Sequence, residues 1–402
     1  MSEMNTEHTQ SQIWGSRRIL SNIFQHLTVK DLCSISCVCR LWNDISKEKS
    51  LRQKAFQTVI VPIICSKTFR YNKHRKYDIY PSLLEKAHLA SCLEFVPQIC
   101  LLFKDEKFPL SAGGCKTEEI DYKHYQRQLP MDAICLYIAT TSLIFDSWTI
   151  GGDSNTAIAT FLQSIPGISV QYCSISYDDV RDFYNNGSVR AKVDEVLIPK
   201  DDEFSCLVLL LSKECKLRGT SDFTKRIFNN IKKGFDPDKC CLWGGDVSYL
   251  SETRLDDPNI FCIGMKLSGP RLRVCTCAIK KGLSLDDYEM ILRRIKQEIP
   301  SKCQTVGFFI ASIEADDESF FTGSALDEHG DLVDLCENIF PHFKFSYLFQ
   351  ADARVFSDYQ IGTDSEPEFQ YTNCIAIMFL SYGQNITIDS VSSFDSDDYS
   401  HY

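Results

Sequence analysis

Few residues of this chain combine types and spacing that could do chemistry, and the clearest are Gly244, Gly245 and Asp246. They follow residues 240–243, an apolar run that we expect to form a buried strand. A ligand of an α/β sheet commonly binds beyond the carboxyl end of such a strand, and an aspartate there could hold an amine. A tight turn that needs glycine backbone freedom explains the same residues more simply. The sequence leaves both interpretations open.

The nineteen cysteines are the other chemistry-bearing set. No Cys-x-x-Cys occurs, and the Cys-x-Cys pairs at Cys37/Cys39 and Cys275/Cys277 lack the spacing of most zinc sites. Most cysteines lie inside apolar runs such as residues 206–211, where a thiol behaves as a small core side chain. The polar N-terminus does not resemble an export signal, so we expect reduced structural thiols, no disulfide framework and no metal site.

No catalytic constellation rises above background. The sequence contains no Gly-x-Ser-x-Gly elbow, no phosphate-binding Gly-x-x-x-x-Gly-Lys, no Gly-x-Gly-x-x-Gly and no His-Glu-x-x-His. Its eight histidines are scattered. We therefore expect a protein that is not an enzyme, with no catalytic residues and no cofactor.

Composition narrows the classes of partner. The apolar fraction of 44% and charged fraction of 24% are typical of a globular protein with an ordinary core. A net charge of -11 disfavours general affinity for nucleic acid or anionic membranes. No apolar run approaches the ~20 residues that a membrane helix needs. We expect no nucleic-acid partner, no membrane partner, and a cytoplasmic and/or nuclear location.

Residues 66–80 are basic and interleaved with aromatic residues. This pattern is compatible with a nuclear-import signal or a nucleic-acid patch. A solvated loop between modules is the interpretation we favour, because the rest of the chain is acidic enough to offer it internal partners.

The elements around these residues begin with a dense helical region at residues 18–45. Three short amphipathic patterns share it, with apolar residues at helical offsets. Their apolar residues are Ile19, Leu20, Ile23, Phe24 and Leu27, then Leu32 and Ile35 after a candidate N-cap at Thr28, then Val38, Leu41, Trp42 and Ile45. Fewer than ~40 residues rarely bury so much apolar surface alone. Part of this surface is therefore expected to contact another protein, although a three-helix cap packed on the rest of the chain is the alternative.

The spacing of Leu27, Asp31-Leu32, Val38-Cys39-Arg40 and Trp42 resembles the F-box. It departs from the family at the start, where Ile19-Leu20-Ser21 replaces the common Leu-Pro pair. The resemblance implies docking onto the adaptor Skp1 and, through it, onto a cullin scaffold. The residues implied to bind Skp1 are Ile19, Leu20, Ile23, Leu27, Leu32, Val38, Leu41 and Trp42.

Beyond the helical region the pattern alternates between strands and helices. Strands are predicted at residues 58–64, 93–103, 133–145, 168–175, 204–211, 240–243, 260–268, 271–280, 305–313, 344–350 and 371–382. Helices are predicted at residues 156–165, 221–233, 284–299 and 331–340, and a β-hairpin is predicted around Gly269-Pro270. Ser284 and Asp287 have the spacing of a capping box, and Glu289 and Arg293 that of a helical ion pair. The fold class is α+β or α/β, with a small three-helix module followed by a layered α/β region.

This region resembles the F-box only protein 22 family, in which the F-box precedes N-terminal and C-terminal FIST domains. Residues 243–250, 264–271, 305–312 and 340–345 carry the resemblance through their order and spacing. It implies a substrate-recognition subunit of a Skp1–cullin–F-box ubiquitin ligase that promotes proteasomal degradation of its targets. A small-ligand sensor for amino-acid-like molecules is the alternative. The implied domains are a disordered start at 1–13, the F-box at 14–57, a linker at 58–80, FIST-like halves at 81–255 and 256–383, and a disordered tail at 384–402.

The chain departs from the FIST pattern at residues 312–316 and 349–356, where the family's arginine and glycines are replaced. Glycines permit close backbone approach to a ligand, and arginine is the usual partner of a ligand carboxylate. Their loss favours recruitment through an exposed surface instead of a liganded pocket. The residues proposed for a substrate or ligand surface are Gly244, Gly245, Asp246, Glu314, Asp316, Asp317, Gln350 and Asp352.

Overall fold

A computed structural model of the chain describes more than half of its residues, which belong to two compact units. The described residues are 16–24, 27, 34–52, 56–62, 93, 97–105, 129, 133–145, 148–150, 156–163, 168–182, 191, 194–196, 204–213, 220–236, 239–252, 260–270, 272–299, 303–313, 325–351, 353–358, 360–361 and 369–382. The first unit is formed by Met1–Cys100, Lys116–Cys135 and Ala159–Pro166, and the second by Leu101–Cys115, Leu136–Ile158 and Gly167–Tyr402.

The described part of the first unit begins with helices α2 and α4. Helix α2 is Arg17–Phe24 and helix α4 is Arg40–Arg52, with a helical turn at residues 34–36 between them. Strand β1, Phe56–Pro62, follows α4. The amphipathic patterns at the start and end of residues 18–45 are therefore confirmed as helices.

A five-stranded sheet has the strand order β1-β6-β2-β3-β10. Its further strands are β2 (Pro97–Asp105), β3 (Ile134–Thr140), β6 (Thr156–Gln163) and β10 (Tyr249–Glu252). Strand β6 replaces the helix predicted at residues 156–165, so that prediction was wrong. Residues 157–163 are buried without interruption, and such an apolar run cannot be told from a short helix by its spacing.

A six-stranded sheet in the second unit has the order β17-β15-β9-β8-β11-β7. Its strands are β7 (Ser169–Ser176), β8 (Ser205–Ser212), β9 (Cys240–Val247), β11 (Ile260–Ser268), β15 (Arg354–Ser357) and β17 (Gln370–Thr372). The short helix α9, Tyr177–Asp182, follows β7. Helix α11, Thr220–Gly234, packs on this sheet through Phe223, Ile227 and Ile231, as its sequence predicted.

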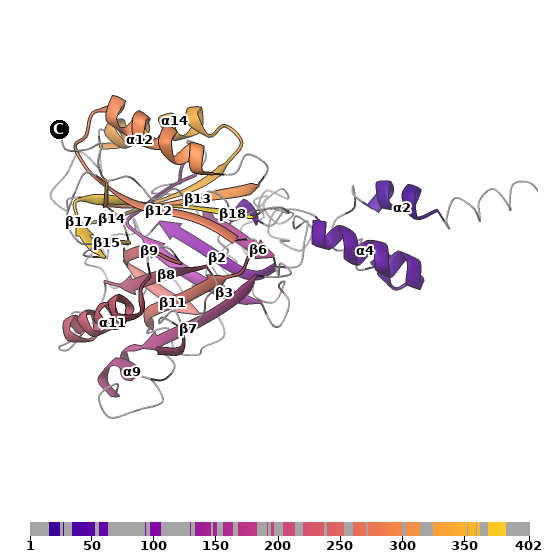
Figure 1. Ribbon diagram of the computed structural model, residues 1–402, viewed down its shortest axis with the longest axis horizontal. Coiled ribbons are helices and arrows are strands. Elements are labelled where there is room, and N and C mark those ends of the chain that lie inside the picture. The colour runs from indigo at the N-terminus through magenta and orange to yellow at the C-terminus, as the bar shows by residue number, and fades with distance from the viewer. Residues whose placement is uncertain are drawn as a thin grey trace, which may run out of the picture. The chain divides into compact units, whose positions relative to one another are not determined.

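A seven-stranded sheet has the order β16-β12-β18-β13-β14-β4-β5. Its strands are β4 (Ser142–Phe145), β5 (Trp148–Ile150), β12 (Leu272–Lys280), β13 (Gln304–Ile313), β14 (Lys344–Ala351), β16 (Gln360–Ile361) and β18 (Cys374–Tyr382). Helices α12 (Leu285–Glu298) and α14 (Ala325–Ile339) cover one face of it (Figure 1). The predicted capping box at Ser284 and Asp287 and the Glu289–Arg293 ion pair of α12 are confirmed.

The two large sheets pack face to face. Trp243 Nε1 on β9 donates to the carbonyl oxygen of Ala376 on β18 at 3.2 Å, and the Trp243 and Phe308 rings lie 5.8 Å apart. Cys206 Sγ lies 3.8 Å from Met378 Sδ across the same interface. The second unit therefore has the layer order α11, six-stranded sheet, seven-stranded sheet, and α12 with α14 (Figure 1).

The predicted hairpin at residues 260–280 was wrong. Strand β11 pairs with β7 and β8, whereas β12 pairs with β18 in the other sheet. Gly269 lies between them with φ 147°, in the region that favours glycine. Strand β11 is buried along its whole length, and two adjacent buried runs do not reveal whether they pair with each other.

Two other predicted strands are each divided between sheets. The run at 133–145 forms β3 and β4, which belong to different sheets. The run at 371–382 is divided by Asn373, whose φ of 55° ends β17 before β18 begins. Strand β4 pairs with β14, and β15 pairs with β9. Strands from the two predicted FIST-like halves are therefore interleaved. The domain boundaries themselves stay predictions.

Candidate functional site

The N-terminal helices are held together by a very small core. Leu20 and Phe24 of α2 and Ile45 of α4 are almost fully buried. The Phe24 and Trp42 rings meet edge to face with centroids 5.5 Å apart, and Ser46 Oγ donates to the Trp42 carbonyl oxygen at 2.7 Å. These contacts fix α2 against α4.

Among the described residues of this module, three large apolar side chains are exposed to solvent. Ile19 and Ile23 are each 42% exposed and lie one helical turn apart on α2, beside the buried stripe of Leu20 and Phe24. Val38, in the turn before α4, is 61% exposed. We call Ile19, Ile23 and Val38 the exposed apolar set. An exposed set of this kind is characteristic of a surface that another protein covers.

The eight residues predicted to bind Skp1 therefore divide into four groups. Ile19, Ile23 and Val38 are exposed, and Leu20 belongs to the core. Leu27, Leu41 and Trp42 are partly buried against that core. Leu32 lies outside the described residues.

Gly244 and Gly245 lie inside β9, so the interpretation of these glycines as a tight turn after a strand was wrong. A Cβ atom at Gly244 would lie 1.8 Å from the carbonyl oxygen of Leu209, and one at Gly245 would lie 3.0 Å from that of Arg354. The two glycines are thus required for the close packing of β9 against the neighbouring strands.

The Asp246 carboxylate is engaged within the chain. Arg354 on β15 donates to it from Nε at 2.8 Å, from a terminal guanidinium nitrogen at 2.9 Å and from its backbone N–H at 3.0 Å. Arg354 was missed by the sequence analysis, although it lies in the segment at 349–356 that departs from the family. The pair ties β9 to β15, and the arginine stands where an amine ligand was envisaged.

The described members of the proposed substrate or ligand surface are buried and not exposed. Gly244, Gly245, Asp246 and Gln350 are all buried, and Gln350 Oε1 accepts a hydrogen bond from Ser248 Oγ at 2.8 Å. Glu314, Asp316, Asp317 and Asp352 lie outside the described residues.

Burial makes the thiols poor nucleophiles. It raises the pKa of Cys240 to about 12 and that of Cys262 and Cys277 well above the usual range. A reactive cysteine needs an accessible site that favours the thiolate. Within the described ranges, no group of three or more histidine, cysteine or acidic side chains has the arrangement of a metal site.

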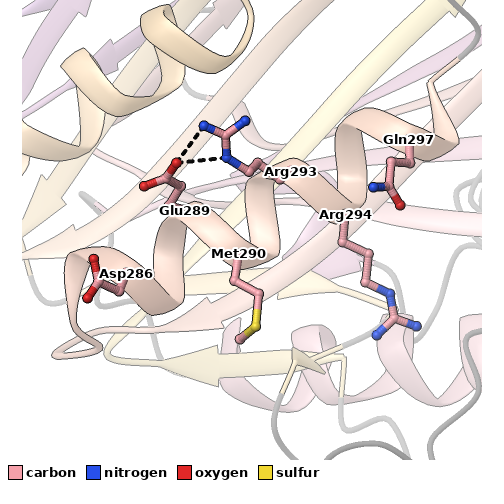
Figure 2. Close-up of a pocket in the computed structure, with 6 residues that line it drawn as sticks. All are labelled: Asp286, Glu289, Met290, Arg293, Arg294 and Gln297. Atoms are coloured by element: carbon pink, nitrogen blue, oxygen red, sulfur yellow. Dashed lines mark hydrogen bonds and ion pairs between the residues drawn. The ribbon is translucent and has the colours of Figure 1, made fainter.

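A shallow depression on α12 also lacks the form of a ligand site. Its lining residues all come from one helix, and Figure 2 shows them spread along its outer side, with Arg293 directed to Glu289. The lining residues are Asp286, Glu289, Met290, Arg293, Arg294 and Gln297. A site that holds a small molecule normally surrounds it on several sides. None of the described helices combines the length and apolar character required to cross a membrane.

The family comparison agrees with the geometry of the N-terminal helices. Residues 17–58 match the F-box-like family model. F-box only protein 22 from Pongo abelii and from Homo sapiens are each 19% identical to this chain over 316 residues, covering 73% of this chain and 74% of each relative. A crystal structure of cyanuric acid hydrolase from A. caulinodans aligns over 82% of this chain and 99% of its own, with a TM-score of 0.35 and 8% identity. The chain thus carries an F-box-like domain at its N-terminus, followed by an α/β region, and it is distantly homologous to F-box only protein 22.

Proposed function

We propose that this protein is a substrate-recruiting subunit of a Skp1–cullin ubiquitin ligase. The observation that carries the proposal is the coincidence of the F-box-like match at 17–58 with the exposed apolar set Ile19, Ile23 and Val38. The core of Leu20, Phe24 and Ile45 fixes the helix that carries Ile19 and Ile23 against α4, which follows Val38. The adaptor Skp1 covers it and connects the chain to the cullin scaffold.

The chain contributes proximity and not chemistry in this proposal. By holding a substrate beside a charged conjugating enzyme, it raises the effective concentration of the substrate lysine. The buried thiols, with their raised pKa values, suit this non-catalytic role. The layered second unit serves as the rigid scaffold whose exterior binds the substrate. Transfer of ubiquitin marks that substrate for proteasomal degradation.

The exposed apolar set gives the first test. Replacing Ile19, Ile23 and Val38 by Ser should remove the contact that the exposed part of each side chain makes with Skp1. Full burial of such side chains is worth about 1.5–3 kcal/mol, so the exposed fractions together correspond to about 2–4 kcal/mol. The triple variant should therefore bind Skp1 roughly 30- to 700-fold more weakly, which calorimetry with the full chain and purified Skp1 can measure.

The control is a second exposed apolar set of similar size. Leu283 precedes α12, whereas Leu285 and Met290 belong to it, and all three lie in the other unit. Their triple replacement by Ser should leave the dissociation constant for Skp1 unchanged. Wild-type affinity in the Ile19/Ile23/Val38 variant would refute the docking surface, and no binding by the unmodified chain would refute the proposed function.

A further inference from the structure

Helix α11 carries a basic outer face. Lys225, Arg226, Lys232 and Lys233 are all exposed, with exposed Asn229 among them. Offsets of one, seven and eight residues place the four cations within about 120° of the helix circumference at 3.6 residues per turn. We call these five residues the α11 basic face.

The buried apolar side of α11 keeps the α11 basic face directed toward solvent. Phe223, Ile227, Phe228 and Ile231 are buried in the cluster that contains Leu207, Leu209 and Leu242 of the six-stranded sheet. Figure 1 shows α11 on the outer side of that sheet. The basic face therefore cannot turn inward without unpacking the helix.

Helix stability explains only half of these cations. Lys232 and Lys233 lie in the last turn, where positive charge interacts favourably with the helix dipole. Lys225 and Arg226 lie almost two turns earlier and gain little from it. The α11 sequence contains a single acidic residue, Asp222, three positions before Lys225, so the helix carries four cations and one carboxylate.

Acidic groups of neighbouring elements compensate the face only in part. Asp194 accepts a hydrogen bond from Asn230 Nδ2 at 3.2 Å at the flank of the helix, Glu195 is exposed beside it, and Asp236 is exposed just beyond the helix. Arg226 and Lys232 also interact within the chain. A positive surface nevertheless persists in a chain of net charge -11, and this contrast gives it the potential to select a ligand.

We propose that the α11 basic face binds an acidic segment of the recruited protein, an inference that rests on the function proposed above. The four cations span about 12 Å along the helix, which an extended peptide covers with about four residues. A short segment with two or three carboxylates therefore matches the face, and Asn229 adds a neutral hydrogen-bonding group between the cations. The net negative charge of the chain repels long polyanions such as nucleic acid and anionic membranes, whereas a short peptide interacts mainly with the local face.

Fluorescence anisotropy with the full chain and a labelled peptide of ten glutamates tests this surface. The Lys225→Glu/Lys233→Glu variant should bind the peptide at least about tenfold more weakly than the wild type, because two attractive contacts become repulsive. Raising the salt concentration should weaken wild-type binding through screening. The unfolding temperature should fall only slightly, because both side chains are exposed and only Lys233 interacts with the helix dipole.

The matched control is Arg293→Glu/Arg294→Glu on α12, which changes net charge by the same amount on another helix. Its peptide affinity should change less than about threefold. An equal loss in both variants would show a net-charge effect and overturn the proposal, as would tighter binding of duplex DNA or phosphatidylserine vesicles than of the peptide. Skp1 binding by the wild-type chain separates the two proposals. Skp1 binding without peptide binding refutes only the basic face, and peptide binding without Skp1 binding refutes only the ligase role.

Discussion

Asp358 provides a pH test of how the two large sheets are joined. It follows β15, and its Oδ1 accepts hydrogen bonds from the backbone N–H of Leu242 on β9 and from the hydroxyl of Thr276 on β12. Desolvation of its carboxyl group between the sheets raises its pKa from 3.8 to about 6, and the hydrogen bonds from Thr276 and Leu242 only partly oppose this rise. The carboxylate is thus a polar link between layers that is costly to keep charged.

The folded chain binds this proton more tightly than the unfolded chain does. The resulting stabilisation is complete below about pH 4 and is lost as pH rises through about 6, amounting to about 3 kcal/mol. Asp358→Asn has no such proton to lose. The stability of this variant minus that of the wild type should therefore rise by about 2.5 kcal/mol between pH 4 and pH 7.5, whatever constant offset the amide introduces.

The difference can be measured in urea at a series of pH values. A hydrogen-exchange pulse at one fixed pH, followed by mass spectrometry of the β9 and β12 peptides, reports unfolding of the second unit alone. Because the comparison subtracts the wild type, the titration of other carboxylates cancels. Parallel stability curves for wild type and variant would show that Asp358 titrates normally and would refute the desolvation of its carboxyl group.

Two further predictions concern close packing and charge in the second unit. Arg354→Ala should cost about 3 kcal/mol of unfolding free energy in urea, because it leaves the Asp246 carboxylate buried without its partner. The double variant Arg354→Ala/Asp246→Ala should cost less than the sum of the two single changes. Additive costs would contradict the pairing. Gly307→Ala should lower the free energy of unfolding by about 1–3 kcal/mol, because the new Cβ would lie 2.2 Å from Phe345 Cδ1. The loss should be smaller in a chain that also carries Phe345→Leu. An equal loss with and without Phe345→Leu would contradict the steric explanation.

The sequence predicted elements best where local chemistry decides them. The periodic apolar face of α11, the capping box of α12 and the helical patterns around Leu20 and Ile45 are all present in the structure. Each is set by residues within a few turns of one another. A helix with its own cap and apolar face requires little information from the rest of the chain.

Pairing between strands was far less predictable. Strands β6 and β11 are buried on both faces, so they lack the alternation that would indicate which side faces a core. The separation of β11 and β12 into different sheets depends on partners as distant as β7 and β18. The Asp246–Arg354 pair was hidden for the same reason, since its members are 108 residues apart.

The glycine and aspartate chemistry of β9 serves the structure of the sheet. Gly244 permits contact with the β8 backbone, Gly245 permits contact with β15, and Asp246 is bound by Arg354. Changes at these positions therefore alter stability, because every group has a partner inside the chain. The α11 basic face has the opposite property, since its outward side chains can change charge while Phe223 and Ile231 hold the helix in place. A protein that recruits others through such a face can change the charge pattern that it selects in a partner without changing its own core. The two sets of variants measure this separation between binding and stability.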